Sequence, residues 1–327
     1  MLELIQAAEA GDRRALARLI TQVERGLDSL EGDSAESIIS AVYPHTGRAH
    51  IIGVTGSPGS GKSSLVNELA KAFRRQNRSV GVIAVDPSSP FTGGALLGDR
   101  IRMRDLSGDK GVFIRSMASR GRLGGLARAT SGVIKLLDAA GFEIILVETV
   151  GAGQAEVDIA GTAHTTLVVE APGMGDDIQT IKAGILEIAD LIILNKADRP
   201  GHESTAKALQ TMLRLGHSTR ARADNPENYW PPILLETVAI NGEGISDLVA
   251  AIERHRVYLQ TTGEWLEREK DRSRQEIEQL LAGYWLRRLA VTIPQAFREE
   301  LVTAVATRKL DPYTAVAQLS AQLTRSL

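Results

Sequence analysis

The sequence predicts an α/β fold, a mostly parallel and doubly wound sheet with helical segments before and after it. Two observations support this prediction. Between His50 and Gln260, short runs rich in valine and isoleucine alternate with longer amphipathic segments, as buried parallel strands alternate with covering helices. After Gly263 only helical patterns follow. We therefore expect an N-terminal helical segment at 1–47, an α/β domain at 48–262 and a helical extension at 263–327.

The N-terminal segment, from Leu2 to about Val42, carries apolar residues at helical spacing. Ile5 and Leu16 are examples, and they are separated by Glu, Arg and Ala. Gly11-Asp12 interrupts the pattern, so we expect two short helices joined at this point.

Seven apolar runs are predicted as strands because they are rich in β-branched residues and apolar on both sides. These runs are Ile51–Thr55, Val80–Val85, Val112–Ile114, Glu143–Val147, Thr166–Val169, Leu191–Leu194 and Ile233–Val238. Helical segments are predicted between most of them, for example at Ser64–Arg75, Ala127–Ala140, Ile178–Ile188 and Glu203–Leu215.

The C-terminal extension begins with a long charged helix, Glu264–Leu289, which Pro294 ends. Two shorter helices follow, at about Gln295–Thr307 and Pro312–Thr324. The long helix also carries large apolar side chains, Trp265, Ile277, Leu281, Tyr284 and Trp285. Such residues on an appended helix need a partner surface. We expect a twofold homodimer formed by this arm; packing against the chain's own α/β domain is the alternative.

The composition excludes several classes of protein. With 38 basic and 40 acidic residues the net charge is −2, and aromatic residues make up 4%, so we expect no nucleic-acid partner. The absence of cysteine removes disulfides, thiolate metal sites and cysteine nucleophiles. No apolar run approaches the roughly 20 residues that span a bilayer, so we expect no membrane partner. The acidic N-terminus lacks a signal-peptide pattern, which favours a cytoplasmic location.

A glycine-rich loop between a strand and a helix is the strongest motif. It matches G-x-x-x-x-G-K-[ST] and runs Gly56-Ser57-Pro58-Gly59-Ser60-Gly61-Lys62-Ser63. Backbone N–H groups of such a loop wrap the phosphates of a nucleotide. We expect Lys62 to reach the β- and γ-phosphates, Ser63 to ligate Mg²⁺, and Ser64 to complete the binding loop. The alternative is a glycine-rich turn with an exposed lysine. The motif predicts a P-loop NTPase domain.

Asn195, Lys196 and Asp198 follow a predicted strand and match N-K-x-D, a guanine-recognition pattern. Guanine offers two adjacent donors, N1–H and N2–H₂, which one carboxylate can accept, whereas adenine lacks this pair. Asp198 therefore favours GTP and GDP, and the domain is predicted as a G domain. Lys196 is expected to lie over the base. The segment Thr237-Val238-Ala239 carries no serine at its centre, so only the N–H of Ala239 is expected to bind guanine.

Glu148-Thr149-Val150-Gly151 ends another predicted strand, in the place of a D-x-x-G element. Glu148 is expected to support Mg²⁺ and Gly151 to sense the γ-phosphate. Ala152 follows the glycine and the nearest glutamine is Gln154, so the hydrolytic arrangement differs from that of Ras. The alternative for Glu148 is a buried helix cap.

Two polar loops complete the predicted site. Asp86 follows a strand, and Asp99 lies in the glycine-rich segment after it, so both are candidate Mg²⁺ ligands beside Ser63 and Glu148. Helix capping is the alternative for both aspartates. Ala171–Lys182 contains two glycines and the pair Asp176-Asp177, which could cap the next helix or form a nucleotide-sensing loop with Lys182 reaching the acidic site. The predicted catalytic residues are Lys62, Glu148, Asp99 and Lys182.

Three stretches are more specific than the phosphate loop: V-D-P-S-S at 85–89, V-E-T-V-G-A-G-Q at 147–154 and P-G-M-G-D at 172–176. Together with the loops above they closely resemble the MeaB/ArgK-type GTPases, the methylmalonyl-CoA mutase-associated G-protein chaperones, counterparts of human methylmalonic aciduria type A protein. The resemblance runs over nearly the whole chain. It implies a homodimer through the C-terminal helices. It also implies GTP hydrolysis coupled to loading and protection of an adenosylcobalamin-dependent mutase, methylmalonyl-CoA mutase.

Two other functions compete with this one. A GTPase that delivers a metal, like the related nickel-insertion proteins, is disfavoured because the sequence has no cysteine and no histidine-rich tract. A phosphotransferase is suggested by the label lysine/arginine/ornithine transport kinase that such proteins have carried. It would need an acceptor pocket with a catalytic base, for which the sequence shows no motif.

Overall fold

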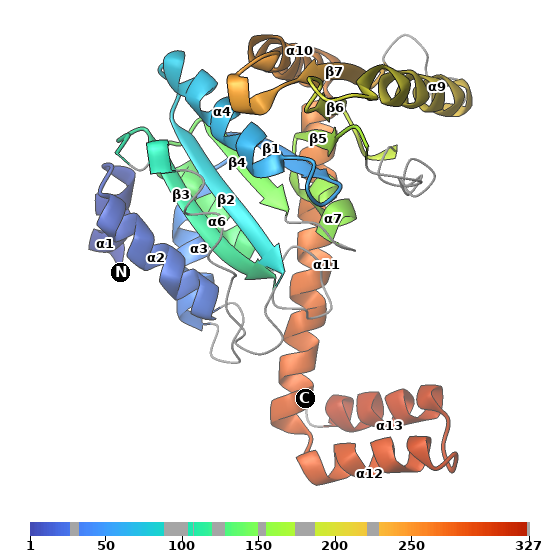
Figure 1. Ribbon diagram of the computed structural model, residues 1–327. Coiled ribbons are helices and arrows are strands. Elements are labelled where there is room, and N and C mark those ends of the chain that lie inside the picture. Colours follow the sequence, from blue (N-terminus) through green and yellow to red (C-terminus); the bar gives the residue numbers. More distant parts are fainter. Residues whose placement is uncertain are drawn as a thin grey trace. The chain divides into compact units, whose positions relative to one another are not determined.

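The computed structural model describes residues 1–26, 33–87, 104–106, 108–119, 128–149, 155–173, 187–220 and 229–325. The chain divides into two compact units, Met1–Glu269 and Lys270–Leu327, whose elements are labelled in Figure 1. The boundary falls within a long helix, so the first turn of that helix belongs to the α/β unit. The predicted division into 1–47, 48–262 and 263–327 stays a prediction.

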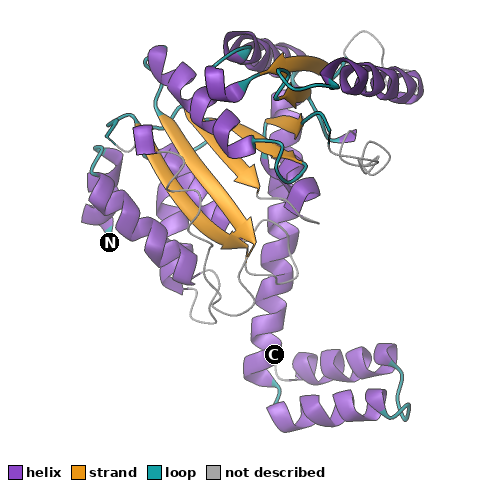
Figure 2. Ribbon diagram, viewed as in Figure 1, coloured by secondary structure: helices purple, strands orange, loops and turns teal. Residues whose placement is uncertain are grey.

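Among the described residues, seven strands form one sheet in the order β3-β2-β4-β1-β5-β6-β7, and every neighbouring pair is parallel (Figure 2). The predicted parallel, doubly wound α/β fold is therefore confirmed. β1 lies between β4 and β5, which is where the sheet winding reverses and where such folds bind ligands. The strands are β1 His50–Gly56, β2 Val80–Pro87, β3 Val112–Ser119, β4 Ile144–Thr149, β5 Thr165–Glu170, β6 Leu191–Asn195 and β7 Ile233–Thr237.

Helices cover both faces of the sheet, and the central strands β1, β4, β5 and β6 are buried along their whole length. Neighbouring residues of β2 belong to different cores: Val82 packs in a cluster with Leu69 of α4, and Ile83 in a cluster with Leu137 of α6. In the described parts of this unit the α-helices are α1 Leu2–Glu9, α2 Arg13–Gly26, α3 Asp33–Val42, α4 Lys62–Arg75, α6 Arg128–Ala139, α7 Ala155–Thr162, α9 His202–Arg220 and α10 Ile245–Thr262.

Several helices differ from the sequence prediction. The junction at Gly11-Asp12 is present, with Gly11 at φ 93° and the Asp12 carboxylate accepting the N–H of Arg14 at 2.8 Å. Within its described residues the N-terminal segment nevertheless holds three α-helices, α1 to α3, instead of two. α7 and α10 were not predicted, because their short or dense apolar patterns are ambiguous without packing partners. Most of the predicted helix Ile178–Ile188 lies outside the described residues.

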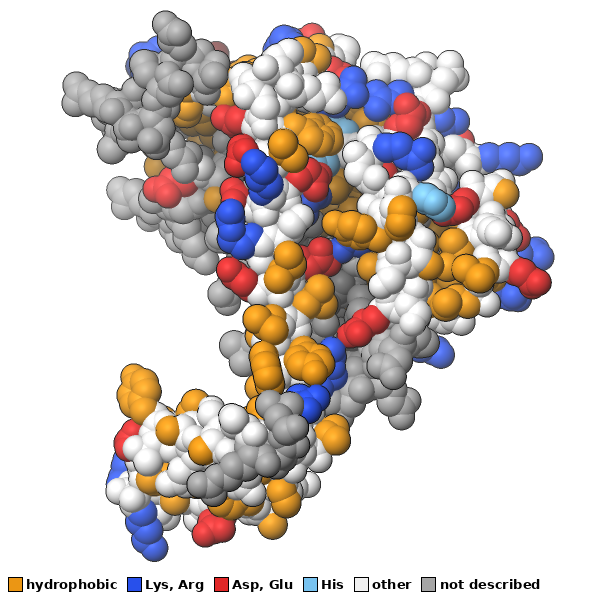
Figure 3. Space-filling view, turned by 180° about the vertical axis from the view of Figure 1, so that it is seen from behind, with side chains coloured by type: hydrophobic (Ala, Val, Ile, Leu, Met, Phe, Trp, Pro, Cys, Tyr) orange, Lys and Arg blue, Asp and Glu red, His pale blue; other side chains and the backbone are white. Residues whose placement is uncertain are grey.

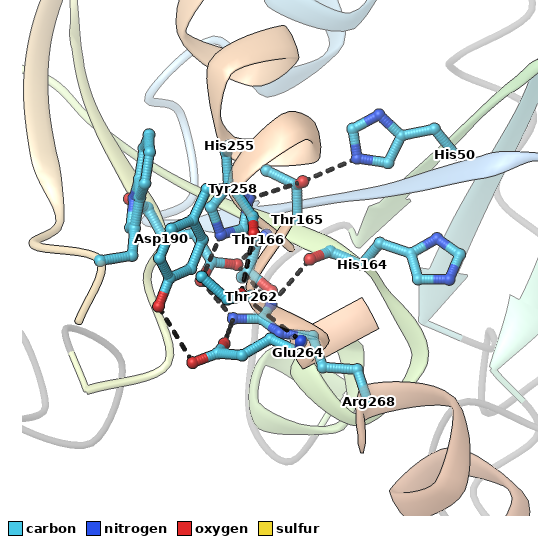
Figure 4. Close-up of polar contacts among 11 residues, drawn as sticks. His50, His164, Thr165, Thr166, Asp190, His255, Tyr258, Thr262, Glu264 and Arg268 are labelled. Atoms are coloured by element: carbon cyan, nitrogen blue, oxygen red, sulfur yellow. Dashed lines mark hydrogen bonds and ion pairs between the residues drawn. The ribbon is translucent and has the colours of Figure 1, made fainter. Parts of the chain in front are cut away.

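A polar network joins the amino-terminal ends of the central strands to the start of the long helix α11, Glu264–Thr292 (Figure 4). Asp190, just before β6, accepts the backbone N–H of Thr166 at 2.8 Å and both terminal nitrogens of Arg268 at 2.8 and 2.9 Å. Arg268 also donates to the carbonyl of His164 at 2.7 Å. The Trp230 indole donates to the carbonyl of Asp190 at 3.0 Å. This network lies at the amino-terminal ends of the strands, whereas the glycine-rich loop follows the carboxyl end of β1.

Trp265 packs against a residue of the same network. Its ring stacks on His164 with the ring centroids 3.7 Å apart, and His164 Nε2 lies 2.6 Å from Glu269 Oε1. The expectation that Trp265 belongs to an exposed arm surface was therefore wrong. Its side chain packs on its own α/β unit because the first turn of the helix is fixed there.

Two buried histidines of the network share one hydroxyl (Figure 4). The Thr165 Oγ1 atom lies 2.7 Å from His50 Nε2 and 2.9 Å from His255 Nδ1. Burial is the largest cause that lowers the pKa of His255 to about 4, and it also holds the pKa of His50 well below its ordinary value. Both rings are thus neutral in the folded protein near pH 7.

We expect the free energy of unfolding to decrease as the pH falls from 6.5 toward about 4. In the unfolded chain both imidazoles bind a proton near pH 6.5, whereas in the folded chain they stay neutral, so acid favours unfolding. Each ring adds a slope of up to about 1.4 kcal/mol per pH unit in this window. Urea titrations across the window measure the slope. His255→Gln should reduce it, and an unchanged slope in that variant would contradict the assignment.

The second unit contains most of a long helix and a pair of shorter ones: α11 Glu264–Thr292, α12 Gln295–Ala306 and α13 Pro312–Arg325. Among its described residues the buried apolar side chains are Ile293, Leu301, Ala315 and Leu323. This is a small core for three helices. Figure 3 shows apolar side chains gathered on the surface of α11. None of the helices in the described ranges is both long and apolar enough to cross a membrane.

Candidate functional site

The glycine-rich loop runs from the carboxyl end of β1 into α4, as its motif requires. Gly56, Gly59 and Gly61 have φ values of 127°, 79° and 95°. A β-carbon at Gly61 would lie 2.4 Å from Asn195 Nδ2, and one at Gly56 would lie 2.1 Å from the carbonyl oxygen of Val169. Both glycines are therefore needed for the loop to approach its neighbours.

Lys62 folds back over this loop. Its Nζ donates to the carbonyl oxygens of Gly56 at 2.7 Å and of Ser57 at 2.9 Å. The residue is buried, with 6% of its surface exposed. Two of its three N–H donors are thus directed by the loop itself, which fixes the direction of the ammonium group. An ammonium held at a loop of backbone N–H groups is suited to bind phosphate.

Ser63 and Glu148 meet at the other end of the loop. The Ser63 hydroxyl donates to Glu148 Oε1 at 2.6 Å, and both residues are buried. Glu148 is brought there by β4, which pairs with β1 in the register Val54↔Glu148. The pair offers two hard oxygen atoms beside the phosphate loop. This donor set fits Mg²⁺, which takes oxygen ligands and keeps much of its water.

Asn195 connects the loop to the ends of β6 and β7. Its Nδ2 donates to the Ser60 carbonyl at 2.8 Å, and its Oδ1 accepts from the Thr237 hydroxyl and the Ala239 N–H, each at 3.1 Å. The side chain is buried, with 2% of the residue exposed. The Ala239 N–H, predicted to bind guanine, thus donates to Asn195 in this structure. Asn195, at the end of β6, therefore links the phosphate loop to the end of β7 and to the segment that follows β7.

Lys196 and Asp198 lie on the turn that follows β6. Lys196 adopts φ 59°, and its Nζ donates to the Gly59 carbonyl at 2.6 Å. Burial, and then the positive charge of Arg199, lower the pKa of this ammonium. The side chain therefore spans from the turn to the phosphate loop, while Asp198 is exposed to solvent.

Glu170 is a site residue that the sequence analysis did not select. It is the last residue of β5, and 4% of it is exposed. Its Oε2 accepts the Ser57 hydroxyl at 2.6 Å. One signal could have identified it: a carboxylate directly after an apolar strand and before the Ala171–Lys182 loop.

Comparison with known families identifies the chain. The sequence model of the family "Methylmalonyl Co-A mutase-associated GTPase MeaB" matches residues 16–292, which is most of the chain. The chain belongs to the MeaB family. It is therefore a GTPase that binds guanine nucleotides, and its glycine-rich loop is that of a P-loop G domain.

Relatives of this MeaB-family GTPase match it over nearly its full length. A protein of Pyrococcus horikoshii named as a GTPase is 48% identical over 313 residues, 96% of this chain and 95% of that protein. GTPase ArgK of Escherichia coli is 34% identical over 331 residues, 98% of this chain and 96% of ArgK. A crystal structure of LAO/AO transport system kinase has a TM-score of 0.70 and 25% identity, covering 99% of this chain and 97% of that chain.

Some predicted site residues of this MeaB-family GTPase lie outside the described residues. Asp86 lies in β2, but its side chain is not described. The others are Asp99, Gly151, Asp176, Asp177 and Lys182. Their assigned roles stay predictions.

Proposed function

We propose that this MeaB-family GTPase is a chaperone of an adenosylcobalamin-dependent acyl-CoA mutase, with methylmalonyl-CoA mutase as the first candidate partner. GTP binding and hydrolysis gate the loading of adenosylcobalamin and protect the mutase. The observation that carries this proposal is the match of residues 16–292 to a family whose description names association with that mutase.

The phosphate groups of GTP bind to the loop at 56–64. Backbone N–H groups and the amino terminus of α4 face the phosphates, and Lys62 supplies a directed positive charge. Ser63 and Glu148 hold Mg²⁺, with Asp86 and Asp99 as further candidate ligands. When bound, the ion neutralises charge on the phosphate oxygens.

Guanine binds where the turn after β6 meets the phosphate loop. Asp198 accepts the two adjacent donors of guanine, and the Lys196 stem lies along the base. Asn195 Nδ2 carries two N–H groups, and its bond to Ser60 uses one of them, so the other can donate to the base. The buried bonds to Thr237 and Ala239 keep this amide in place.

We further propose that α11 forms the dimer interface of the homodimer. An apolar stripe is exposed on this helix: Ile277 64%, Leu281 54%, Tyr284 47% and Trp285 42%. These residues follow the spacing i, i+4, i+7 and i+8, so they share one face. The small core of the second unit also favours a partner surface that completes it.

Trp285→Glu in the full-length chain is expected to convert the dimer to a monomer, because a carboxylate in an apolar interface loses its hydration. Light scattering measures the mass. Leu286→Glu is the matched control: Leu286 is 67% exposed on the same helix but points to the opposite face, so this variant should stay dimeric. A dimer that survives Trp285→Glu and Leu281→Glu together would rule out this interface.

The chaperone role is tested through the coupling of mutase binding and nucleotide state. Calorimetric titration of methylmalonyl-CoA mutase with this protein should give different affinities for the GDP and GTP-analogue forms, by about 5-fold or more. The reciprocal effect is required: the mutase must then change nucleotide affinity by the same factor. We also expect the mutase to accelerate hydrolysis. Equal affinities in both states, with an unchanged GTPase rate, would remove the proposed role and leave the GTPase assignment intact.

A further inference from the structure

Both ends of the phosphate loop are fixed by the same kind of contact. At one end Ser63 donates to Glu148 of β4, and at the other Ser57 donates to Glu170 of β5, both at 2.6 Å. β4 and β5 are the two neighbours of β1 in the sheet. The first contact belongs to the proposed Mg²⁺ site. The second has no part in the roles assigned so far.

The position of Ser57 follows from the pairing of β1 and β5. Gly56 is in register with Val169, so the next residues, Ser57 just after β1 and Glu170 at the end of β5, lie side by side. The close approach of Gly56 to the Val169 carbonyl allows no side chain at Gly56. The first residue of the loop able to carry an anchoring side chain is therefore Ser57.

Ser57 also acts on Lys62 through its backbone. Its carbonyl oxygen accepts Lys62 Nζ at 2.9 Å, and the Gly56 carbonyl accepts the same group at 2.7 Å. Gly56 is held by the strand, whereas Ser57 lies beyond it and depends on its own contacts. A continuous chain of bonds thus runs from Glu170 through Ser57 to the Lys62 ammonium.

We propose that Glu170 is a positioning residue for GTP hydrolysis. Its carboxylate fixes Ser57, and the Ser57 carbonyl directs the Lys62 ammonium to the phosphates. The inference rests on the proposed nucleotide site. Lys62 acts most strongly where negative charge develops in the transition state, and a displaced ammonium weakens that interaction. Loss of Glu170 therefore reduces kcat more than it raises KM.

The test is a set of variants at both partners in the full-length protein. Glu170→Met keeps the side-chain length but removes the acceptor, and kcat should fall by about 10-fold, since small misplacements of catalytic groups have effects of this order or larger. Glu170→Gln keeps an acceptor oxygen for the Ser57 hydroxyl and should restore most of kcat. Ser57→Ala should reduce kcat as Glu170→Met does. The double variant should be no slower than either single variant, because both remove the same contact.

A destabilisation control separates positioning from general loss of structure. Asp138 is another buried carboxylate, and it accepts the backbone N–H groups of Gly47, Arg48 and Ala49, which precede β1, whereas the phosphate loop begins at the carboxyl end of that strand. Asp138→Asn should lower the melting temperature but leave kcat at saturating GTP unchanged. Thermal denaturation and phosphate release are measured on every variant.

Two outcomes would overturn the inference: a wild-type kcat in Glu170→Met, or additive losses in the double variant. Failure of the proposed nucleotide site gives a different result, because Lys62→Ala would then hydrolyse GTP at the wild-type rate. An inactive Lys62→Ala with a fully active Glu170→Met rejects only the role of Glu170.

Discussion

Lys62→Ala is expected to abolish GTP hydrolysis, with kcat reduced by about 10³-fold. The ammonium is buried, and two loop carbonyls direct it, so it needs little reorganisation as charge develops on the phosphate oxygens. No neighbouring water can replace a fixed positive charge of this kind at equal strength. Phosphate release under single-turnover conditions measures the rate without the contribution of nucleotide exchange.

Lys71→Ala is the matched control for this experiment. Lys71 lies on the same helix, α4, and pairs with Glu68 at 2.8 Å and Asp105 at 2.9 Å, away from the loop. Its loss removes the same charge from the protein and should leave the rate near that of the wild type. Hydrolysis by Lys62→Ala at the wild-type rate would place the phosphate site elsewhere.

Asp198→Asn is expected to change the base preference of the protein from guanine to xanthine. The wild-type carboxylate accepts N1–H and N2–H₂ of guanine. In Asp198→Asn the side-chain NH₂ group would face the N2–H₂ group of guanine, so two donors would oppose each other. Xanthine has an oxygen at this position, which can accept from the NH₂ group. Where a buried site hydrogen-bonds its ligand, a mismatched ligand binds about 10⁴-fold more weakly. Because Asp198 is exposed, we expect a smaller effect: Asp198→Asn should bind GTP about 10²-fold more weakly than the wild type does.

Competition of GTP, XTP and ATP against a fluorescent guanine nucleotide measures this preference. Asp247→Asn serves as the control, because Asp247 lies exposed in the first turn of α10 and carries the same charge. It should keep guanine preference. Comparable affinity of the wild-type protein for ATP and GTP would reject the role of Asp198.

The phosphate loop with Lys62 and the guanine motif with Asp198 were predictable because each motif consists of residues close together in the chain. The spacing of Gly56, Gly61, Lys62 and Ser63 encodes a loop whose backbone shape depends on adjacent residues. The strands were predictable for a similar reason, since runs such as Leu191–Leu194 are apolar on both faces. The sequence analysis did not name α10, because its dense apolar residues show a clear pattern only once they are seen packed against α4 and the sheet.

Trp265 illustrates how a correct element can carry a wrong assignment. The helix that contains it was predicted, and its apolar residues were expected to face a second subunit. In the structure Arg268 and Glu269 bind to the sheet edge and to His164, so the first turn packs inward while Ile277 and Trp285 are exposed. Periodicity gives the face of a helix, but not where along its length the helix leaves its own domain.

The α/β class, the phosphate loop and the guanine motif can be read from local sequence, because each depends on residues close together in the chain. Which strand ends meet depends on the tertiary fold. Ser57 and Glu170 are separated by 113 positions, and Asn195 and Ser60 by 135. These contacts exist because β5 lies next to β1 and β6 next to β5. Strand order is set by the packing of both cores together, and no local pattern in the sequence encodes it.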